Sequence, residues 1–366
     1  MIDLYKIELN PFIDGGVLVP SKSPWRSAVM LVIKPDGKTW RMVTDFRMAN
    51  KQVKKRNWPL PRIDATLTAI AGAKFFSSVD QNNCYFQLPL SDARSRDWAT
   101  IQTPLGVFSY TRCPQGYINS QADLMRFMDL YVMSGLSWRC CLAYSDDCII
   151  WSRTGEQHIL DIDSVLCRVE YFGIQLKASK CEFFVPKLVF LGYEISAEGI
   201  RPSPKKTSAV LLLPLPQTSK DLKGFCAKVG YYRHNMKSLA EKLAALSDLE
   251  QKNCSWPHTY TETEKNSFES VKRELCSEDT MLAIRDLQYK LAVDADGSKY
   301  GIAATLMQLS KPEKPIMYAS RKLRPSERLY HAYAIEVLAV VFGITVFRPW
   351  IVFEEFILRI DCVALR

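Results

Sequence analysis

Apolar and polar positions alternate over short distances through roughly the first two hundred residues of the chain. Brief apolar runs that are rich in β-branched and aromatic residues predict strands. They lie at residues 17–19, 28–33, 40–45, 75–79, 142–151 and 188–195. Longer stretches with apolar residues three or four positions apart predict helices at 118–134 and 156–171. These elements together predict an α+β fold for this part of the chain.

The pattern changes after residue 202. Residues 202–250 look helical, with Pro204 near a helix start and Pro214 as a stop. A polar connector and a helix-like run at 263–276 follow. The sequence YKLAVDADGSKYGIAATLMQ, which begins at Tyr289, predicts two strands joined by a turn at Asp-Gly-Ser in a unit that begins near residue 288. A small helical region and then a second α/β unit are therefore predicted.

Composition narrows the class of protein. A chain of 366 residues with 48% hydrophobic residues can fill more than one core. Lys and Arg number 48 against 39 Asp and Glu, a net charge of +9, which favours a large polyanionic partner. Eleven scattered cysteines without a CxxC pair predict free thiols in a reducing compartment. No secretory signal and no apolar run near about 20 residues is recognised, so an intracellular protein outside the membrane is expected.

Two adjacent carboxylates carry the strongest chemical signal. Asp146 and Asp147 lie between apolar runs in CLAYSDDCIIWS, which predicts a hairpin with the acidic pair at its tight turn. Close carboxylates beside a core are costly unless something neutralises them. An ordinary solvated turn is the alternative, but such a turn does not need flanks rich in Ile, Cys and Trp. A functional pair is therefore favoured.

A third carboxylate is predicted to join this pair. Asp80 ends the apolar strand at 75–79 and precedes a turn-prone QNN sequence; a helix N-cap or turn acid is the alternative. Carboxylates from two strand ends would repel one another unless divalent cations neutralised them, and Mg²⁺ takes carboxylate and phosphate oxygens. Two such ions form the clamp used for in-line phosphoryl displacement. Asp80, Asp146 and Asp147 are thus predicted to hold two Mg²⁺ ions, with Mn²⁺ as a substitute.

Six sequence blocks then establish a resemblance. They are KPDGKTWRMVTDFRMANK (34–51), WPLPRID (58–64), AKFFSSVDQNNCYFQLPL (73–90), CPQGYINS (113–120), YSDD (144–147) and FLGYEIS (190–196). In order and spacing they closely resemble the polymerase domain of reverse transcriptases from gypsy-like long-terminal-repeat retrotransposons and retroviruses. The blocks SKDLKGFCAKVGYYRHNM, DADGSKYGIAATL and YASRKLRPSERLYHAYAIEVLAV extend the similarity over most of the chain, although RHNM departs from the family's more apolar continuation.

The resemblance implies roles for single residues. Asp80, Asp146 and Asp147 match the metal-binding catalytic carboxylates. Further positions match residues that handle the deoxynucleoside triphosphate: Lys34 and Arg41 for its β- and γ-phosphates, Tyr85 for the gate that excludes a 2′-hydroxyl, and Gln115 for nucleotide contact. By themselves, Lys34 and Arg41 could equally be solvated strand-edge cations and Tyr85 a core aromatic. Gln115 looks retroviral, because gypsy-like elements often carry Phe there. Gly192 belongs to the block that resembles the primer grip.

The C-terminal part resembles the RNase H domain that follows the polymerase in these elements. Asp296, Glu336 and Asp361 match three of its four metal-binding carboxylates; Asp294 competes with Asp296 but lacks the right distance to YGIAA. Later helices and the fourth carboxylate would lie beyond Arg366, so a truncated domain with uncertain RNase H activity is expected. No helix is expected before Gly15 either. The chain is interpreted as a fragment of a longer Pol polyprotein or a decayed genomic copy.

The implied architecture is a right-hand polymerase followed by a partial RNase H-like α/β domain. Fingers and palm, with an antiparallel sheet, would occupy 1–198, a helical thumb 199–250, a connector 251–287 and the RNase H-like domain 288–366. The basic runs KQVKKRNW and SPKKTS would contact an RNA or DNA template-primer duplex, unless they serve solubility alone.

The predicted function is RNA-directed DNA polymerisation by two-metal phosphoryl transfer. A non-catalytic nucleic-acid-binding remnant is one alternative. An RNA-directed RNA polymerase is another, against which Tyr85 and the RNase H-like tail argue. The implied partners are the template-primer, deoxynucleoside triphosphates and other Pol modules such as protease and integrase, with no membrane. The cytoplasm, a virus-like particle or the nucleus would be the location.

Overall fold

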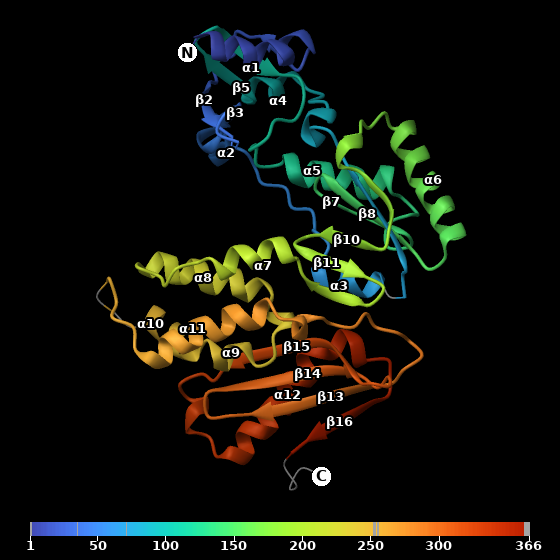
Figure 1. Cartoon of the computed structure of the whole chain (residues 1–366). Coiled ribbons are helices and arrows are strands. Elements are labelled where there is room, and N and C mark those ends of the chain that lie inside the picture. Colours follow the sequence, from blue (N-terminus) through green and yellow to red (C-terminus); the bar gives the residue numbers. More distant parts are fainter. Residues whose placement is uncertain (1, 35, 71, 252–253, 255, 362–366) are drawn as a thin grey trace. The chain divides into compact units, whose positions relative to one another are not determined.

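The computed structural model describes residues 2–34, 36–70, 72–251, 254 and 256–361 (Figure 1). They fold into two compact units. Unit 1 comprises Met1–Ala69 with Phe75–Val185, and unit 2 comprises Ile70–Lys74 with Pro186–Arg366. The cysteines among the described residues are free thiols.

Unit 1 begins with a five-stranded sheet in the order β1-β6-β5-β2-β3. The strands are β1 (Leu18–Pro20), β2 (Ser27–Ile33), β3 (Trp40–Asp45), β5 (Thr100–Thr103) and β6 (Gly106–Tyr110). Helices α2 (Arg47–Gln52) and α4 (Ala93–Trp98) follow β3 and precede β5 in the chain. Buried side chains from these strands and from Leu9 and Phe46 form one hydrophobic cluster. The strands predicted at 28–33 and 40–45 are confirmed.

A helix does precede Gly15, contrary to the expectation from the sequence. Helix α1 spans Ile2–Asp14 and buries Leu9 against the first sheet, with Tyr5 and Phe12 packed beside it. These apolar residues have helical spacing. Pro11 lies inside the helix, where a proline usually ends one, and this obscured the pattern.

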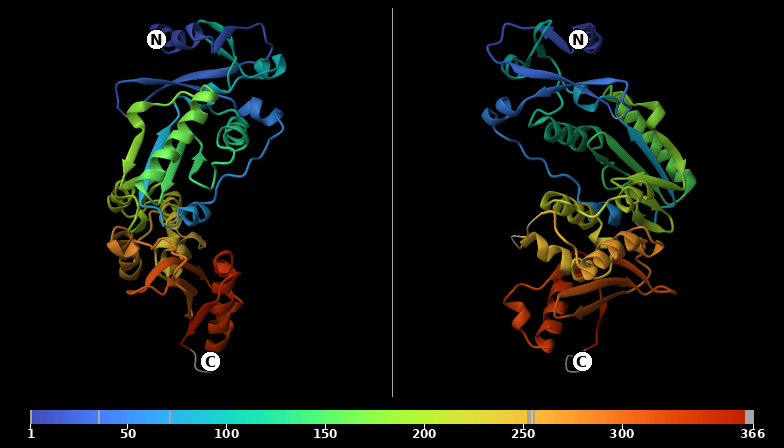
Figure 2. Two further views of the ribbon diagram at one scale, coloured as in Figure 1. Left: turned by 90° about the vertical axis from the view of Figure 1, so that its right-hand side faces the viewer. Right: turned by 60° about the vertical axis from the view of Figure 1, so that its left-hand side comes forward.

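The second sheet of unit 1 has four strands in the order β7-β8-β4-β9, and every neighbouring pair is antiparallel (Figure 2). The strands are β4 (Phe75–Asp80), β7 (Cys141–Tyr144), β8 (Asp147–Ser152) and β9 (Glu182–Val185). Helix α5 (Ser120–Phe127), the π-helical turn Met128–Val132 and α6 (Gly155–Tyr171) supply apolar residues to its core. The predicted helices at 118–134 and 156–171 are thus confirmed, the first in two segments. A short helix α3 (Ile63–Ala69) precedes β4.

Unit 2 opens with a three-stranded antiparallel sheet and continues as helices. The strands are β10 (Lys187–Phe190), β11 (Tyr193–Ser196) and β12 (Gly199–Pro202). The helices are α7 (Pro204–Leu211), α8 (Ser219–Tyr231), α9 (Leu239–Lys242), α10 (Ala244–Gln251) and α11 (Glu262–Leu275). Pro204 opens α7 as predicted, and the helix ends at Leu211, three residues before the predicted stop at Pro214. Capping boxes at Thr218 and Thr261 begin α8 and α11.

The unit ends with a four-stranded sheet in the order β15-β14-β13-β16 and one long helix, α12 (Ala332–Ile351). The strands are β13 (Leu291–Gly297), β14 (Gly301–Gln308), β15 (Lys314–Lys322) and β16 (Phe356–Ile360). Helix α12 lies very close to the sheet, because a Cβ added to Gly343 would stand 2.9 Å from Cβ of Ala304. Asp296 and Gly297 belong to the strand, so the turn predicted at 296–298 begins later, at Ser298.

The expectation that no apolar run approaches membrane-spanning length was wrong. Among the described helices, α12 has the length and apolar composition to cross a membrane. Ile335, Ala339 and Phe347 on one side of it are buried with the strands of the last sheet. This packing is that of a core helix in an α/β unit, and such helices also reach high apolar content.

Compact packing divides the chain between Val185 and Pro186. The three-stranded sheet of β10, β11 and β12 therefore lies wholly within unit 2.

Candidate active site

The acidic pair lies at the tip of the hairpin that the sequence predicted. Strands β7 and β8 pair as far as Tyr144 opposite Asp147, which leaves Ser145 and Asp146 as a two-residue turn. Ser145 adopts φ 59°, and its backbone N–H points at Sδ of Met125 at 3.1 Å. The apolar residues of both strands are buried, and the turn lies at the edge of that core.

Asp80 faces the same hairpin from the neighbouring strand. It ends β4 directly opposite Asp147, and N–H of Gln81 donates to the carbonyl oxygen of Asp146 at 2.9 Å. Residues directly opposite in an antiparallel pair have their Cβ atoms about 4.5–5.5 Å apart. The fold therefore brings Asp80, Asp146 and Asp147 together; we call these three residues the palm carboxylates.

The palm carboxylates repel one another. Partial burial raises the pKa of Asp147, and the charges of Asp146 and Asp80 raise it further. The thiol of the adjacent Cys84 responds too: burial above all, and then the three carboxylates, raise its pKa to about 12. Asp80 itself is only 7% exposed. Such a group needs positive charge, and hard oxygen ligands in this number suit Mg²⁺.

One cation already meets this need. Nζ of Lys180 lies 2.6 Å from Oδ2 of Asp80, and this contact raises the pKa of the lysine. Backbone N–H of Lys177 also donates to the carbonyl oxygen of Asp80 at 2.8 Å, which anchors the segment. Within the described part of the chain, no three His, Cys, Asp or Glu side chains already stand as a metal-binding group. Sequence reasoning missed Lys180, because a lone lysine a hundred residues from Asp80 gives no local signal.

Tyr85 lies beside the acidic hairpin. It belongs to the 3₁₀ turn Cys84–Gln87, which follows the left-handed Asn83 after β4. Its hydroxyl lies 3.3 Å from Oγ of Ser145, and burial raises its pKa. The hydroxyl contact therefore holds the ring of Tyr85 beside Ser145, the residue that precedes Asp146.

The other predicted nucleotide contacts lie on the first sheet and its loops. Lys34 follows β2 and is half-buried, whereas Arg41 on β3 is exposed. Gln115 is exposed in the loop before α5, which Asn50 holds through the carbonyl of Gly116 at 2.9 Å. Among the described residues, no hydrogen bond or ion pair joins Lys34, Arg41 or Gln115 to the palm carboxylates. All of them belong to unit 1.

A second acidic group forms in unit 2 from the predicted RNase H-like residues. Asp296 lies on β13, Glu336 on α12 and Asp361 directly after β16. Burial raises the pKa of Glu336, and the charges of Asp296 and Asp361 raise it further, so the three lie within electrostatic reach. Asp294 instead faces Arg359 across β13 and β16, with Oδ1 3.9 Å from Nε. Gly192, of the predicted primer grip, forms the β10–β11 turn with φ 81° and accepts a hydrogen bond from Tyr232 at 3.1 Å.

Comparison with known proteins agrees with this arrangement. Residues 32–195 match the family model for reverse transcriptase (RNA-dependent DNA polymerase), and residues 260–358 match the model for the RNase H-like domain found in reverse transcriptase. The two matches follow one another in the order that the sequence predicted, a reverse transcriptase region and then an RNase H-like region.

The curated relatives include retrotransposon Pol polyproteins. The chain is 29% identical over 360 residues to the retrovirus-related Pol polyprotein from transposon opus of Drosophila melanogaster, covering 94% of this chain and 35% of that protein. It is 28% identical over 356 residues to that from transposon gypsy of the same organism, covering 93% and 34%. The chain is similar to these retrotransposon Pol polyproteins and spans about a third of their length.

Solved structures share the fold. The foamy viral protease-reverse transcriptase in complex with double-stranded DNA superposes with a TM-score of 0.85 at 21% identity, covering 96% of this chain and 61% of that one. The same protein in complex with an RNA/DNA hybrid gives 0.80 at 20% identity, covering 96% and 46%. The predicted combination of a right-hand polymerase fold and an RNase H-like domain is thereby confirmed.

Proposed function

We propose that this chain is an RNA-directed DNA polymerase that adds deoxynucleotides to a primer. The observation that carries the proposal is the pairing of Asp80 with Asp147 across β4 and β8, with Asp146 in the adjoining turn. These three carboxylates come from the ends of buried strands, so the core fixes their positions. The reverse transcriptase family match over the same residues supports the assignment.

The palm carboxylates would hold two Mg²⁺ ions, for which Mn²⁺ could substitute. When bound, the ions would lower the pKa of the primer 3′-hydroxyl and neutralise charge on the triphosphate. In nucleotide addition the 3′-hydroxyl would lose its proton to solvent, and its oxygen would attack the α-phosphorus. The bond from that phosphorus to the bridging oxygen would break, and pyrophosphate would leave with the electron pair. Lys180 contacts Oδ2 of Asp80, so it would compete with a metal ion for that oxygen.

The remaining polymerase residues would position the nucleotide. Lys34 and Arg41 would take the β- and γ-phosphates, where a forked guanidinium suits two oxygens and an ammonium supplies a point charge. Tyr85, held beside Ser145, would leave no room for a 2′-hydroxyl. Gln115 would contact the incoming nucleotide from its exposed loop.

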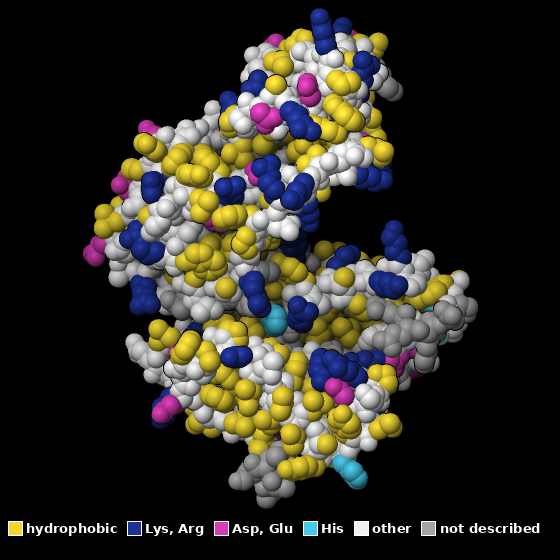
Figure 3. Space-filling model, turned by 180° about the vertical axis from the view of Figure 1, so that it is seen from behind, with side chains coloured by type: hydrophobic (Ala, Val, Ile, Leu, Met, Phe, Trp, Pro, Cys, Tyr) yellow, Lys and Arg dark blue, Asp and Glu magenta, His cyan; other side chains and the backbone are white. Residues whose placement is uncertain are grey.

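The substrate would be a template-primer duplex of RNA or DNA. The net charge of +9 favours such a polyanion. Lys and Arg side chains recur over the face shown in Figure 3, with fewer Asp and Glu among them. The structural neighbours were solved with double-stranded DNA and with an RNA/DNA hybrid. Protease and integrase modules of a parent polyprotein, and an intracellular location in cytoplasm, virus-like particle or nucleus, belong to the same proposal.

We further propose a division into fingers and palm at 1–198, thumb at 199–250, connector at 251–287 and RNase H-like domain from 288. In the last of these, Asp296, Glu336 and Asp361 would bind divalent metal. Their mutual electrostatic effect on Glu336 supports this assignment.

Primer extension on an RNA template with Mg²⁺ and deoxynucleotides tests the proposal. Wild type should extend the primer, and Asp146→Asn should not, although it should bind the duplex almost as well. Asp163→Asn is the matched control, because Asp163 is an exposed aspartate on α6. Duplex binding without extension by wild type would instead show a nucleic-acid-binding remnant, and extension by Asp146→Asn would remove the metal assignment.

A further inference from the structure

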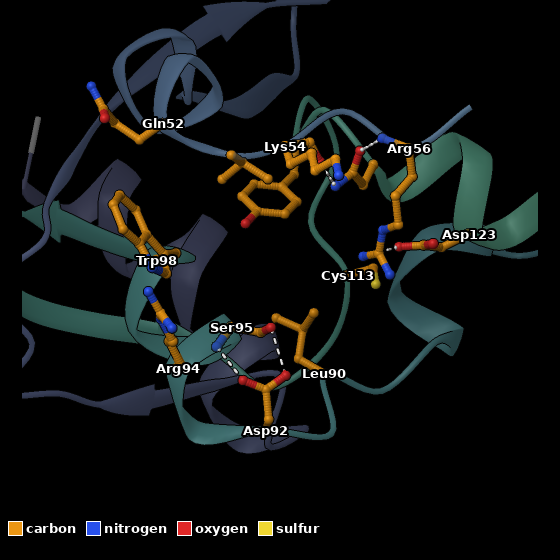
Figure 4. A pocket seen from close by; sticks show the side chains of 13 residues that line it. Gln52, Lys54, Arg56, Leu90, Asp92, Arg94, Ser95, Trp98, Cys113 and Asp123 are labelled. Carbon is orange, nitrogen blue, oxygen red and sulfur yellow. Dashed lines mark hydrogen bonds and ion pairs between the residues drawn. The ribbon is translucent and has the colours of Figure 1, made fainter. Parts of the chain in front are cut away.

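A pocket in unit 1 lies outside the palm carboxylates and has no role in the function proposed above. It has a volume of about 380 Å³ and is lined by the segment after α2, by the segment through α4 and by the loop between β6 and α5 (Figure 4). This volume falls within the range of sites for small organic ligands, about 300–1,000 Å³. The ligand can be inferred from the side chains that line the pocket.

Positive charge dominates the pocket. Lys54 and Arg94 extend into it from different segments (Figure 4), and neither makes an ion pair with any described residue. The two acidic side chains of the lining, by contrast, already have hydrogen-bond or ion-pair partners. Asp92 accepts hydrogen bonds from N–H and Oγ of Ser95 at 2.7 and 2.6 Å, and Asp123 binds Arg56 at 2.9 Å. The hydrogen bonds from Ser95 lower the pKa of Asp92, which keeps its negative charge. With Arg56 paired to Asp123, the lining has a net charge of +1, and Lys54 and Arg94 remain available for an anion.

Two aromatic rings complete the lining and are held rigidly. The Trp98 ring stacks on Trp25 with centroids 3.9 Å apart at 20°. Tyr117 packs edge-to-face on Phe46 with centroids 5.8 Å apart at 82°. Rings whose orientation is fixed in this way lose little freedom when a planar ligand stacks on them.

The segment that carries Lys54 is fastened to the rest of the pocket. The side chain of Asn119 is buried; its Oδ1 accepts from N–H of Arg56 at 2.8 Å, and its Nδ2 donates to the carbonyl of Lys54 at 3.1 Å. A single amide thus holds residues 54–56 against the loop before α5. The pocket is formed before any ligand arrives.

Cations without partners beside rigid aromatic rings are the combination that binds single-stranded nucleic acid, where bases stack and phosphates pair with Lys and Arg. A duplex hides its base faces, and a protein partner would need a larger apolar surface. We propose that this pocket binds one nucleotide of an unpaired strand, with the base at Trp98 and Tyr117 and the phosphates at Lys54 and Arg94.

The unpaired strand that a polymerase encounters is the template ahead of the primer end, and this last step rests on the proposed function. Binding of a single strand to the pocket does not. A direct binding measurement therefore distinguishes failure of the pocket from failure of the polymerase assignment.

The experiment measures anisotropy of a fluorescent deoxyadenosine oligonucleotide with the full chain and without divalent metal. Wild type should bind it, and Arg94→Ala with Lys54→Ala should weaken binding about tenfold, the effect expected when two phosphate contacts are lost. Trp98→Phe keeps a ring above Trp25 and should weaken binding less than Trp98→Ala, which should cost about tenfold. Arg139→Ala, which removes another exposed arginine of unit 1, is the matched control. Each variant is first checked for an unchanged melting temperature.

Two comparisons identify the ligand. An abasic oligonucleotide of equal length should bind wild type more weakly and respond to Arg94→Ala but not to Trp98→Ala. Free dAMP should compete only at far higher concentration than the oligonucleotide. If pocket variants and Arg139→Ala bind equally well, or if Trp98→Ala affects abasic and normal strands alike, the proposal is overturned. Competition by dAMP at the concentration of the oligonucleotide would overturn the assignment to a strand.

Discussion

The two acidic groups of this molecule are assembled in different ways. The palm carboxylates come from strands that pair directly, so the sheet register alone sets Asp80 against Asp147. In unit 2, Asp296, Glu336 and Asp361 come from a strand, a helix and the residue after a parallel strand, so their approach depends on how α12 packs on the sheet. A lysine already opposes the first group. The first group is therefore built by local pairing, and the second by tertiary packing.

The largest expected effect is on primer extension, which should depend on the palm carboxylates and not on the acidic group of unit 2. Asp80→Asn removes a charge from the palm carboxylates, and primer extension should fall by about a thousandfold, or about 4 kcal/mol in transition-state stabilisation. Glu336→Gln removes a charge from the other group and should leave extension unchanged. Single-nucleotide extension of a labelled primer measures both variants. Equal losses in the two variants would contradict two independent sites.

A second test targets the packing on which the unit 2 group depends. A Cβ on Gly297 would lie 2.9 Å from Cγ2 and 3.0 Å from the carbonyl oxygen of Ile335, the neighbour of Glu336. Gly297→Ala should lower the free energy of unfolding by about 1–3 kcal/mol through overpacking. In Gly224→Ala, whose added methyl meets nothing within 4 Å, stability should be kept or raised. Urea denaturation followed by circular dichroism compares them, and equal stability would show that the helix can shift.

Acid should weaken the sheet that carries the palm carboxylates. His158 is fully buried, with Nδ1 2.8 Å from Oγ of Ser152 and Nε2 2.8 Å from Oγ of Ser77, and burial lowers its pKa below the ordinary 6.5. Below pH 6.5 the unfolded chain therefore takes up a proton that the folded chain resists. Stability should fall with pH in this range by at most about 1.4 kcal/mol per unit.

Urea unfolding between pH 7.5 and 5.5 measures this dependence. His158→Gln should be less stable throughout but should lose less stability on acidification than wild type. If both chains lose the same amount, other groups govern the response.

The smallest expected effect concerns the lysine that distinguishes the two groups. Lys180→Met keeps the length of the side chain but removes the ammonium that binds Oδ2 of Asp80. Mn²⁺ should then bind the palm carboxylates a few times more tightly in the absence of nucleotide, because the competing cation is gone. Isothermal titration with Mn²⁺ measures this change, and Lys187→Met, at another exposed lysine, is the control. Weaker binding in Lys180→Met would show that the lysine assists the metal.

The sequence predicted the parts of the site that local pattern specifies. The hairpin around Asp146 and the strand end at Asp80 follow from apolar runs that stop at acidic residues, and the structure has both. The register between strands, and contacts between residues far apart in the sequence, leave no such local pattern. Lys180 reaches Asp80 because β9 pairs with β4, and Asp294 meets Arg359 because β13 and β16 pair in parallel. Helix α1 was not predicted, because a proline such as Pro11 usually ends a helix. In the structure the helix continues through Pro11 and packs its apolar side chains on the first sheet.

The strand register behind the palm carboxylates also constrains the length of the gene. Asp147 points toward the site while the next residue, Cys148, is fully buried in the core. Successive side chains of a strand point to opposite faces, so one inserted or deleted codon within β8 would bury the aspartate and present the cysteine instead. A one-residue insertion in this hairpin should therefore be tolerated less well than many substitutions, whereas the exposed loops of unit 1 can vary in length. A related chain with an inserted or deleted residue in the hairpin of β7 and β8 should therefore be inactive even if it keeps all three acidic residues.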